Sequence, residues 1–146
     1  MHYQVRTTLP VLGSRPYIQG GTLYDAMLTA CEEVQGTAWL RTATTLSCKL
    51  HRLAASNGQI AVSHHPHTLP ADPHATVVVS QADGTRCYAS FVAQGTPVQA
   101  RAHDESQFIC AEDMSTALSG RFVFRQVQTR ADFLYGLLAA NKQLHL

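Results

Sequence analysis

The sequence predicts an α+β fold from two observations. An apolar stripe at helical spacing follows Thr22 and predicts one long amphipathic helix over Thr22–Gln35. Strand-like segments separated by turn residues fill much of the remaining chain, and the clearest pair flanks Ala82-Asp83-Gly84-Thr85. The chain order is therefore one strand, one long helix and then a series of strands, several of them joined by hairpins.

The first strand and the helix follow from their residues. Residues 2–9 alternate strand-forming and polar side chains, and Pro10 ends this segment. Thr22 is the expected N-cap of the helix, and Gly36 stands where the helix is expected to stop. The apolar stripe of the helix is Leu23, Ala26, Met27, Ala30, Cys31 and Val34.

The middle of the chain predicts strands and turns. The expected strands are Leu40–Leu53, Gln59–Ser63, Ala75–Gln81 and Arg86–Gln94. Asn57-Gly58 and Asp83-Gly84 are dipeptides typical of hairpin turns. His64–His74 is a loop rich in proline and histidine, and its His64, His65, His67, Asp72 and His74 have ligand-capable spacing. Because two adjacent histidines cannot easily face one metal ion, a solvated loop is the preferred interpretation.

The last third of the chain predicts two more strands and two more helices. Pro97–Asp104 is polar and continues as an edge strand, and Glu112–Ser119 is expected to form a short helix. Arg121–Thr129 alternates and predicts a strand. Asp132 can cap a final helix that extends to about His145.

Composition excludes several classes of protein. A chain of 146 residues, with 45% apolar and 14% charged residues, predicts a single folded domain. The net charge of +1 gives no electrostatic case for binding nucleic acid. The cysteines are widely spaced and are expected to be reduced thiols. With no signal-like start and no run of membrane-spanning length, the expected location is cytoplasmic, with no membrane partner.

A family resemblance appears at the start of the helix. Arg15-Pro16-Tyr17-Ile18-Gln19-Gly20, followed by Leu23-Tyr24-Asp25-Ala26-Met27, resembles the loop-into-helix motif of the β-hydroxyacyl-(acyl carrier protein) dehydratases. Cys48–Leu53 and Asn57–Ile60 resemble a strand and a turn of the same family. The likeness covers roughly the first 94 residues, so that residues 95–146 form a C-terminal extension of one domain spanning 1–146.

The resemblance implies a hotdog fold, in which an antiparallel sheet wraps around a central helix. It also implies a homodimer with a shared active site and, as substrate, an acyl thioester of coenzyme A or acyl carrier protein. No metal or organic cofactor is needed. In this family a histidine upstream of the loop works with the acid, but Val11 or Leu12 takes its place here. Because valine has no proton to exchange, an acyl thioesterase or a non-catalytic binding module is the alternative.

The resemblance marks Asp25 as the catalytic acid or base and Gln19, Gly20, Gly21, Thr22 and Thr29 as substrate-binding residues. Backbone N–H groups of the glycines would polarise a thioester carbonyl, and Thr29, at i+4 from Asp25, would orient a water or the acid. Each residue also has a purely structural interpretation. Asp25 can complete a capping box with Thr22, the glycines can simply allow a turn, and Thr29 can be an ordinary helix-surface residue.

Overall fold

The protein is described by a computed structural model that covers residues 2–7, 9, 11–12, 17–18, 20–97, 100–101, 109–116, 119–124 and 128–144. The chain divides into two compact units, Met1–Arg101 and Ala102–Leu146. The single-domain organisation of residues 1–146 stays a prediction. Within the described ranges, no helix is long and apolar enough to cross a membrane.

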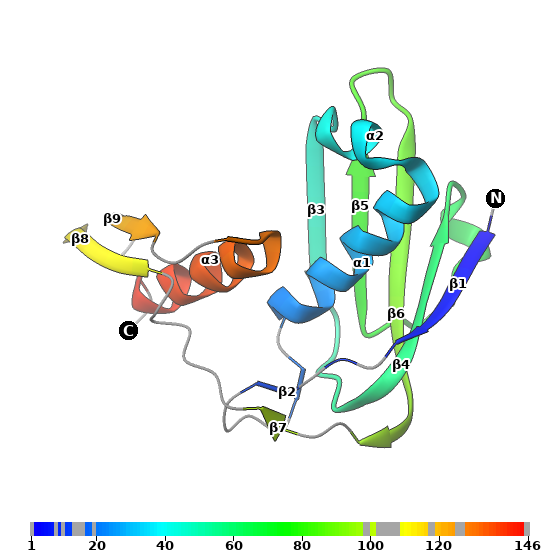
Figure 1. The fold of residues 1–146 in the computed structure, drawn as a ribbon, viewed down its shortest axis with the longest axis horizontal. Helices are drawn as coiled ribbons and strands as arrows, with labels where there is room; N and C mark the ends of the chain where they lie inside the picture. Colours follow the sequence, from blue (N-terminus) through cyan, green and yellow to red (C-terminus); the bar gives the residue numbers. More distant parts are fainter. Residues whose placement is uncertain are drawn as a thin grey trace. The chain divides into compact units, whose positions relative to one another are not determined.

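The first unit is built on a five-stranded antiparallel sheet and one long helix, which confirms the α+β class (Figure 1). The sheet order is β1-β4-β6-β5-β3, and helix α1 lies across one face of it. The bounds are β1 His2–Thr7, α1 Gly20–Gln35, β3 Thr45–Leu50, β4 Ser56–Ser63, β5 Ala75–Ser80 and β6 Arg86–Pro97. A short parallel pair, β2 Val11–Leu12 with β7 Ala100–Arg101, also belongs to this unit.

The core of the first unit lies between α1 and the sheet. In β5, buried and half-buried residues alternate strictly, which places Val77 and Val79 on the side of α1. The largest fully buried side chains of the core are Ile18, Leu23, Met27, Cys31, Ile60, Val62, Val77, Val79, Cys87 and Phe91. Burying a large aliphatic or aromatic side chain stabilises the fold by roughly 1.5–3 kcal/mol. The predicted helical stripe therefore packs the core as expected.

The Asp83-Gly84 turn joins β5 to β6, as predicted. Gly84 has a φ of +88°, a conformation that glycine adopts without strain. The Asp83 carboxylate accepts a hydrogen bond from the Thr85 N–H at 2.8 Å, and the Thr85 bonds hold the pKa of Asp83 below its usual value. The turn dipeptide thus sets the register in which Val79 pairs with Cys87.

The prediction of one strand over Leu40–Leu53 is wrong. Helix α2, Thr37–Arg41, follows Gly36, whose φ of 95° turns the chain after α1. Gln81 binds α2 to the β5–β6 hairpin, because its side-chain amide donates to the Trp39 carbonyl at 2.5 Å. Figure 1 shows α2 at this end of the sheet. Residues with strand-like side chains are therefore held in a helix by tertiary contacts, and the strand begins only at Thr45.

The prediction of a hairpin turn at Asn57-Gly58 is also wrong. Both residues lie inside β4, at a point where the register with β6 shifts between Ser56 and Gly58. A Cβ atom on Gly58 would stand 2.2 Å from the Val92 carbonyl oxygen and 2.7 Å from Cζ of Phe91. Glycine is needed here because β6 comes too close for any side chain. The His64–His74 loop is confirmed and contains one short 3₁₀ helix, Pro66–Thr68.

The second unit contains β8 Ile109–Thr116, β9 Ser119–Phe124 and α3 Arg130–Leu144. The predicted short helix over Glu112–Ser119 is wrong, because most of it is a strand that pairs antiparallel with β9. The final helix is confirmed. Thr129 is its N-cap: the Thr129 hydroxyl accepts from the Asp132 N–H at 3.2 Å, and the Asp132 carboxylate accepts from the Thr129 N–H at 3.0 Å. Asp132 is therefore the reciprocal partner in a capping box.

Candidate functional site

The start of α1 differs from the prediction. The helix begins at Gly20, so Gly20 and Gly21 are helical residues, and Thr22 is the third residue instead of the N-cap. The predicted N-cap is wrong. Ile18 anchors the chain just before this start, because its side chain is fully buried and its N–H donates to the Ala54 carbonyl at 2.6 Å. This anchoring outweighs the low helix propensity of glycine.

Asp25 consequently lies beyond the first turn of α1. The structure describes that turn in full, and it contains no acidic residue. A capping box between Thr22 and Asp25 is thereby excluded, since Thr22 does not cap the helix. The influence of the helix dipole on a charge falls off within the first turn. Any chemical role of the Asp25 carboxylate therefore does not depend on the helix dipole.

Asp25 and Thr29 lie on the flank of α1 away from the sheet. Asp25 is half-buried and Thr29 is exposed, whereas Met27 between them is sealed in the core. The Thr29 hydroxyl donates to the backbone carbonyl of Asp25 at 2.8 Å. This hydrogen bond joins the Thr29 hydroxyl to the helix backbone. The i, i+4 spacing brings the two residues together on this flank, and the role of Thr29 in orienting a water or the acid stays a prediction.

Backbone N–H groups of Gly20 and Gly21 belong to the first turn of α1, where a helix supplies no carbonyl partner for them. Gly21 and Thr22 are buried, and Gly20 is half-buried. Groups of this kind, at the positive end of a helix, suit an anion or a polarised carbonyl oxygen. Gln19 lies outside the described residues, and its predicted role stays a prediction.

Tyr24 and Cys48 add two polar groups that the sequence analysis did not single out as site residues. Tyr24 follows the first turn of α1, and Cys48 lies in β3 at the edge of the sheet. Burial raises the pKa of the Tyr24 hydroxyl, and the nearby Cys48 thiol raises it further. Burial also raises the pKa of Cys48. Both groups are therefore protonated at neutral pH, so that Tyr24 is a hydrogen-bond donor next to Asp25 in the chain. The one sequence signal for Tyr24 was its position within the motif that resembles the dehydratase family.

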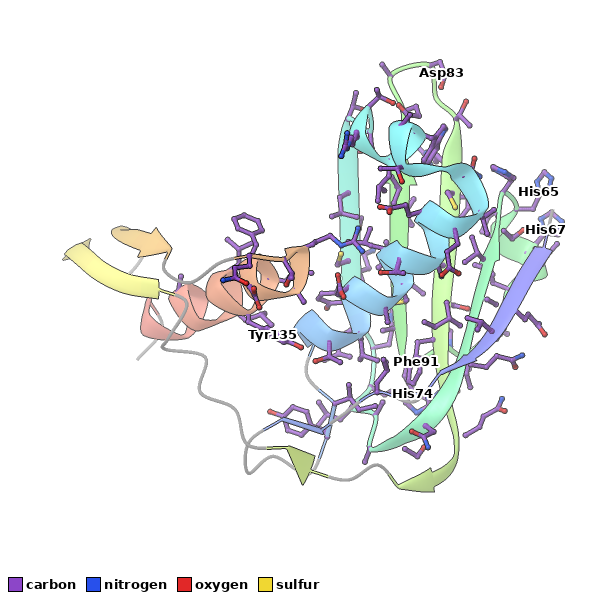
Figure 2. The ribbon with its side chains drawn as sticks, viewed as in Figure 1. His65, His67, His74, Asp83, Phe91 and Tyr135 are labelled. Carbon is purple, nitrogen blue, oxygen red and sulfur yellow. The ribbon has the colours of Figure 1, made fainter. Side chains whose placement is uncertain are left out.

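His74 forms a second polar centre, at the opposite end of the sheet from Asp83 (Figure 2). The backbone N–H of His74 donates to the Phe91 carbonyl at 2.8 Å, and the His74 ring meets the Phe91 ring edge-on with centroids 6.5 Å apart. Its Nδ1 accepts the Ala93 N–H at 3.2 Å, which requires that Nδ1 carry no proton. Arg52 donates to the Asp72 carbonyl at 2.7 Å and pairs with its carboxylate at 3.3 Å.

His74 makes the stability of the first unit depend on pH. Burial lowers the pKa of His74, the Arg52 charge lowers it further, and Asp72 partly offsets both. Between the lowered pKa and the ordinary value of 6.5, the unfolded chain binds a proton that the folded protein does not. We expect the free energy of unfolding to fall as the pH drops below 6.5 through this window.

Urea unfolding of the wild type and of His74→Gln, on both sides of pH 6.5, measures this effect. The variant should show a flatter pH dependence. His67→Gln, which removes an exposed histidine of the same loop, is the matched control and should keep the wild-type slope. Equal slopes for His74→Gln and the wild type would contradict the assignment.

The histidine-rich loop shows no arrangement of metal ligands. His65 and His67 have their ring centroids 5.5 Å apart, and Figure 2 shows both near the end of β4. Over the ranges that the structure describes, no three His, Cys, Asp or Glu side chains are placed to hold one metal ion.

Comparisons of the chain with family models, with curated proteins and with solved structures gave no match. The function is therefore inferred from the fold and from the residues of α1.

Proposed function

We propose that the first unit is a hotdog fold that binds acyl thioesters of coenzyme A or acyl carrier protein. The observation that carries the proposal is the arrangement of β1, α1 and the strands β3 to β6: one antiparallel sheet with α1 packed on its face. This is the element order of a hotdog fold. The motif that leads into α1 adds support, since Asp25-Ala26-Met27 keeps the family-like spacing from Gly20.

In this proposal the start of α1 binds the thioester carbonyl. The N–H groups of Gly20 and Gly21 polarise the carbonyl oxygen, and Asp25 takes a proton from the attacking water. The water oxygen bonds to the carbonyl carbon, the carbon–sulfur bond breaks, and the departing sulfur takes the proton from Asp25 and leaves as a thiol. The half-buried position of Asp25 supports this role, because a substrate can reach a group that is not sealed in the core.

Dehydration is the less favoured reaction. Val11 stands where the family has its histidine, and it lies in β2, paired with Ala100 of β7. A valine cannot remove the proton next to a thioester carbonyl. We therefore propose thioester hydrolysis, or binding alone, in place of dehydratase chemistry.

A homodimer in the cytoplasm is part of the proposal. Among the described residues, strand β3 is the last strand of the sheet, and it exposes Leu46 by 50% and Leu50 by 40%. Open edges with apolar side chains favour pairing with another strand. A second copy of the chain, with the active site shared between the copies, would cover this edge.

An assay with a panel of acyl-CoA and acyl-carrier thioesters tests the proposal. Release of free thiol is followed for each substrate, and binding is measured in parallel by calorimetry with a non-hydrolysable thioether analogue. We expect saturable binding together with thiol release for at least one acyl group. Absence of binding across the panel would refute the proposal.

The second candidate is a module that binds acyl carriers without chemistry. Val11 favours it, because a valine at the position of the family's histidine cannot exchange a proton. Saturable binding of the analogue without any thiol release would select this alternative.

A further inference from the structure

Three basic residues lie at the end of the sheet opposite α2 (Figure 1). Lys49 is near the end of β3, and His51 and Arg52 follow this strand directly. All three residues are exposed. The backbone N–H groups of His51 and Arg52 donate to the His74 carbonyl at 2.8 and 3.1 Å, which fixes this segment next to the start of β5. We call Lys49, His51 and Arg52 the basic rim.

Asp72 orients the guanidinium of Arg52 and leaves part of it open. Nη2 of Arg52 donates to the Asp72 carbonyl oxygen at 2.7 Å and lies 3.3 Å from the Asp72 carboxylate. Among the described residues, both of these contacts use Nη2, so that Nε and Nη1 keep their N–H groups for a ligand. The Arg52 side chain is 48% exposed. Because a guanidinium forms strong, charge-assisted hydrogen bonds with phosphate oxygens, Arg52 is suited to hold a phosphate group.

Lys49 and His51 add to this group on one face of the sheet, beside Thr76. Lys49 is opposite Thr76 in the register of β3 with β5, and opposite residues of an antiparallel pair point to the same face. Nε2 of His51 lies 2.9 Å from the Thr76 hydroxyl oxygen, within hydrogen-bond distance. Lys49 and Arg52 supply two positive charges against the one negative charge of Asp72. The basic rim therefore has an excess of positive charge that favours an anion.

The basic rim is tied to the start of α1. The Ile18 N–H donates to the Ala54 carbonyl at 2.6 Å. Arg52 is two residues before Ala54, and Gly20 is two residues after Ile18. Because two residues of chain span at most about 7 Å, the backbones of Arg52 and Gly20 lie within roughly 20 Å of each other. This distance is comparable with the extended length of a pantetheine arm, which joins a thioester sulfur to the first phosphate.

We propose that the basic rim binds the phosphate groups of coenzyme A, so that acyl-CoA is the thioester that the first unit recognises. This inference rests on the proposed function, in which the thioester carbonyl binds at the start of α1. Coenzyme A carries a diphosphate at the far end of its pantetheine arm and a third phosphate on its ribose, and these groups match the cations of the rim. Acyl carrier protein is disfavoured, because the Asp72 carboxylate is 84% exposed and would repel a broad acidic protein surface.

Calorimetry with a pair of thioether analogues tests the proposal. Both analogues carry the same acyl group, one on coenzyme A and the other on pantetheine, which has no phosphate. We expect the wild-type chain to bind the coenzyme A analogue about tenfold more tightly or better, the level that hydrogen bonds to charged groups contribute. Raising the sodium chloride concentration should reduce this difference, because salt screens exposed charges.

Variants of the rim locate the phosphate contacts. Arg52→Gln should weaken binding of the coenzyme A analogue about tenfold and leave binding of the pantetheine analogue unchanged. Lys49→Gln should have a smaller effect of the same kind. Arg41→Gln is the matched control, because it removes an exposed arginine from α2, at the other end of the sheet, and should leave both affinities unchanged. Since exposed ion pairs contribute little to stability, Arg52→Gln should keep the wild-type melting temperature.

The outcomes separate this inference from the proposed function. Equal affinity of the wild type for the two analogues would overturn the role of the basic rim and leave thioester binding in place. The same conclusion would follow from an Arg52→Gln protein that keeps the full preference for the coenzyme A analogue, or from faster thiol release with acyl carrier protein than with the matching acyl-CoA. Binding of neither analogue would refute the proposed function itself, and the role of the rim with it.

Discussion

Replacing Asp25 with asparagine is expected to lower acyl-thioester turnover by about 10²–10⁴-fold, the range that a positioned acid or base contributes. Asparagine has nearly the same shape but cannot take a proton from water. Asp25 is half-buried and lies beyond the first turn of α1, so its charge interacts little with the helix dipole. We therefore expect a nearly unchanged melting temperature. Initial rates of thiol release and thermal unfolding by circular dichroism measure the two effects.

Glu33→Gln is the matched control for this change. Glu33 is an exposed acid on the same helix, and its replacement also removes one negative charge. It should leave turnover unchanged. Thr29→Val should likewise have a small effect, because the Thr29 hydroxyl donates to a backbone carbonyl. An Asp25→Asn protein as active as the wild type would rule out Asp25 as the catalytic group.

Replacing Gly58 with alanine is expected to lower the free energy of unfolding by about 3 kcal/mol, at the upper end of the cost of overpacking a core. The added Cβ would stand 2.2 Å from the Val92 carbonyl oxygen and 2.7 Å from the Phe91 ring. Phe91 is fully buried, and the Val92 oxygen belongs to the backbone of a central strand. Neither atom can move aside without separating β4 from β6. Urea denaturation measures the change.

Gly20→Ala is the control for the Gly58 substitution. A Cβ atom on Gly20 would meet the Tyr24 ring at 3.3 Å, and that ring belongs to a side chain that can adjust. Alanine also favours a helix over glycine by about 1 kcal/mol. The stability of Gly20→Ala should therefore lie within about 1 kcal/mol of the wild type. Equal stability of Gly58→Ala and the wild type would show that β4 and β6 can separate at low cost.

Local sequence patterns correctly predicted the elements that depend on interactions between residues close together in the chain. The apolar stripe from Leu23 to Val34 depends only on helical spacing, and the core formed as that spacing predicts. The Asp83-Gly84 turn carries its own conformational preference, and so does the capping box of Thr129 and Asp132.

Other parts depended on contacts that local patterns do not contain. Glycine is required at position 58 because the Phe91 ring lies too close for a Cβ atom, and not because the chain turns there. This contact exists only in the packed sheet. Helix α1 begins two residues early because Ile18 is anchored to Ala54, a residue far along the chain. The candidate site differs from the prediction for the same reason. Asp25 lies beyond the first turn of α1, and Tyr24 is a second polar group of the motif.

The position of Trp39 makes the two compact units separately observable. Trp39 is the single tryptophan of the chain, and it packs partly buried against the core of the first unit. Its carbonyl is also bound by Gln81 of the β5–β6 hairpin. Intrinsic tryptophan fluorescence consequently follows the loss of structure in Met1–Arg101 alone, whereas far-ultraviolet circular dichroism also follows α3. Overlaying the two transitions distinguishes one cooperative folding unit from two.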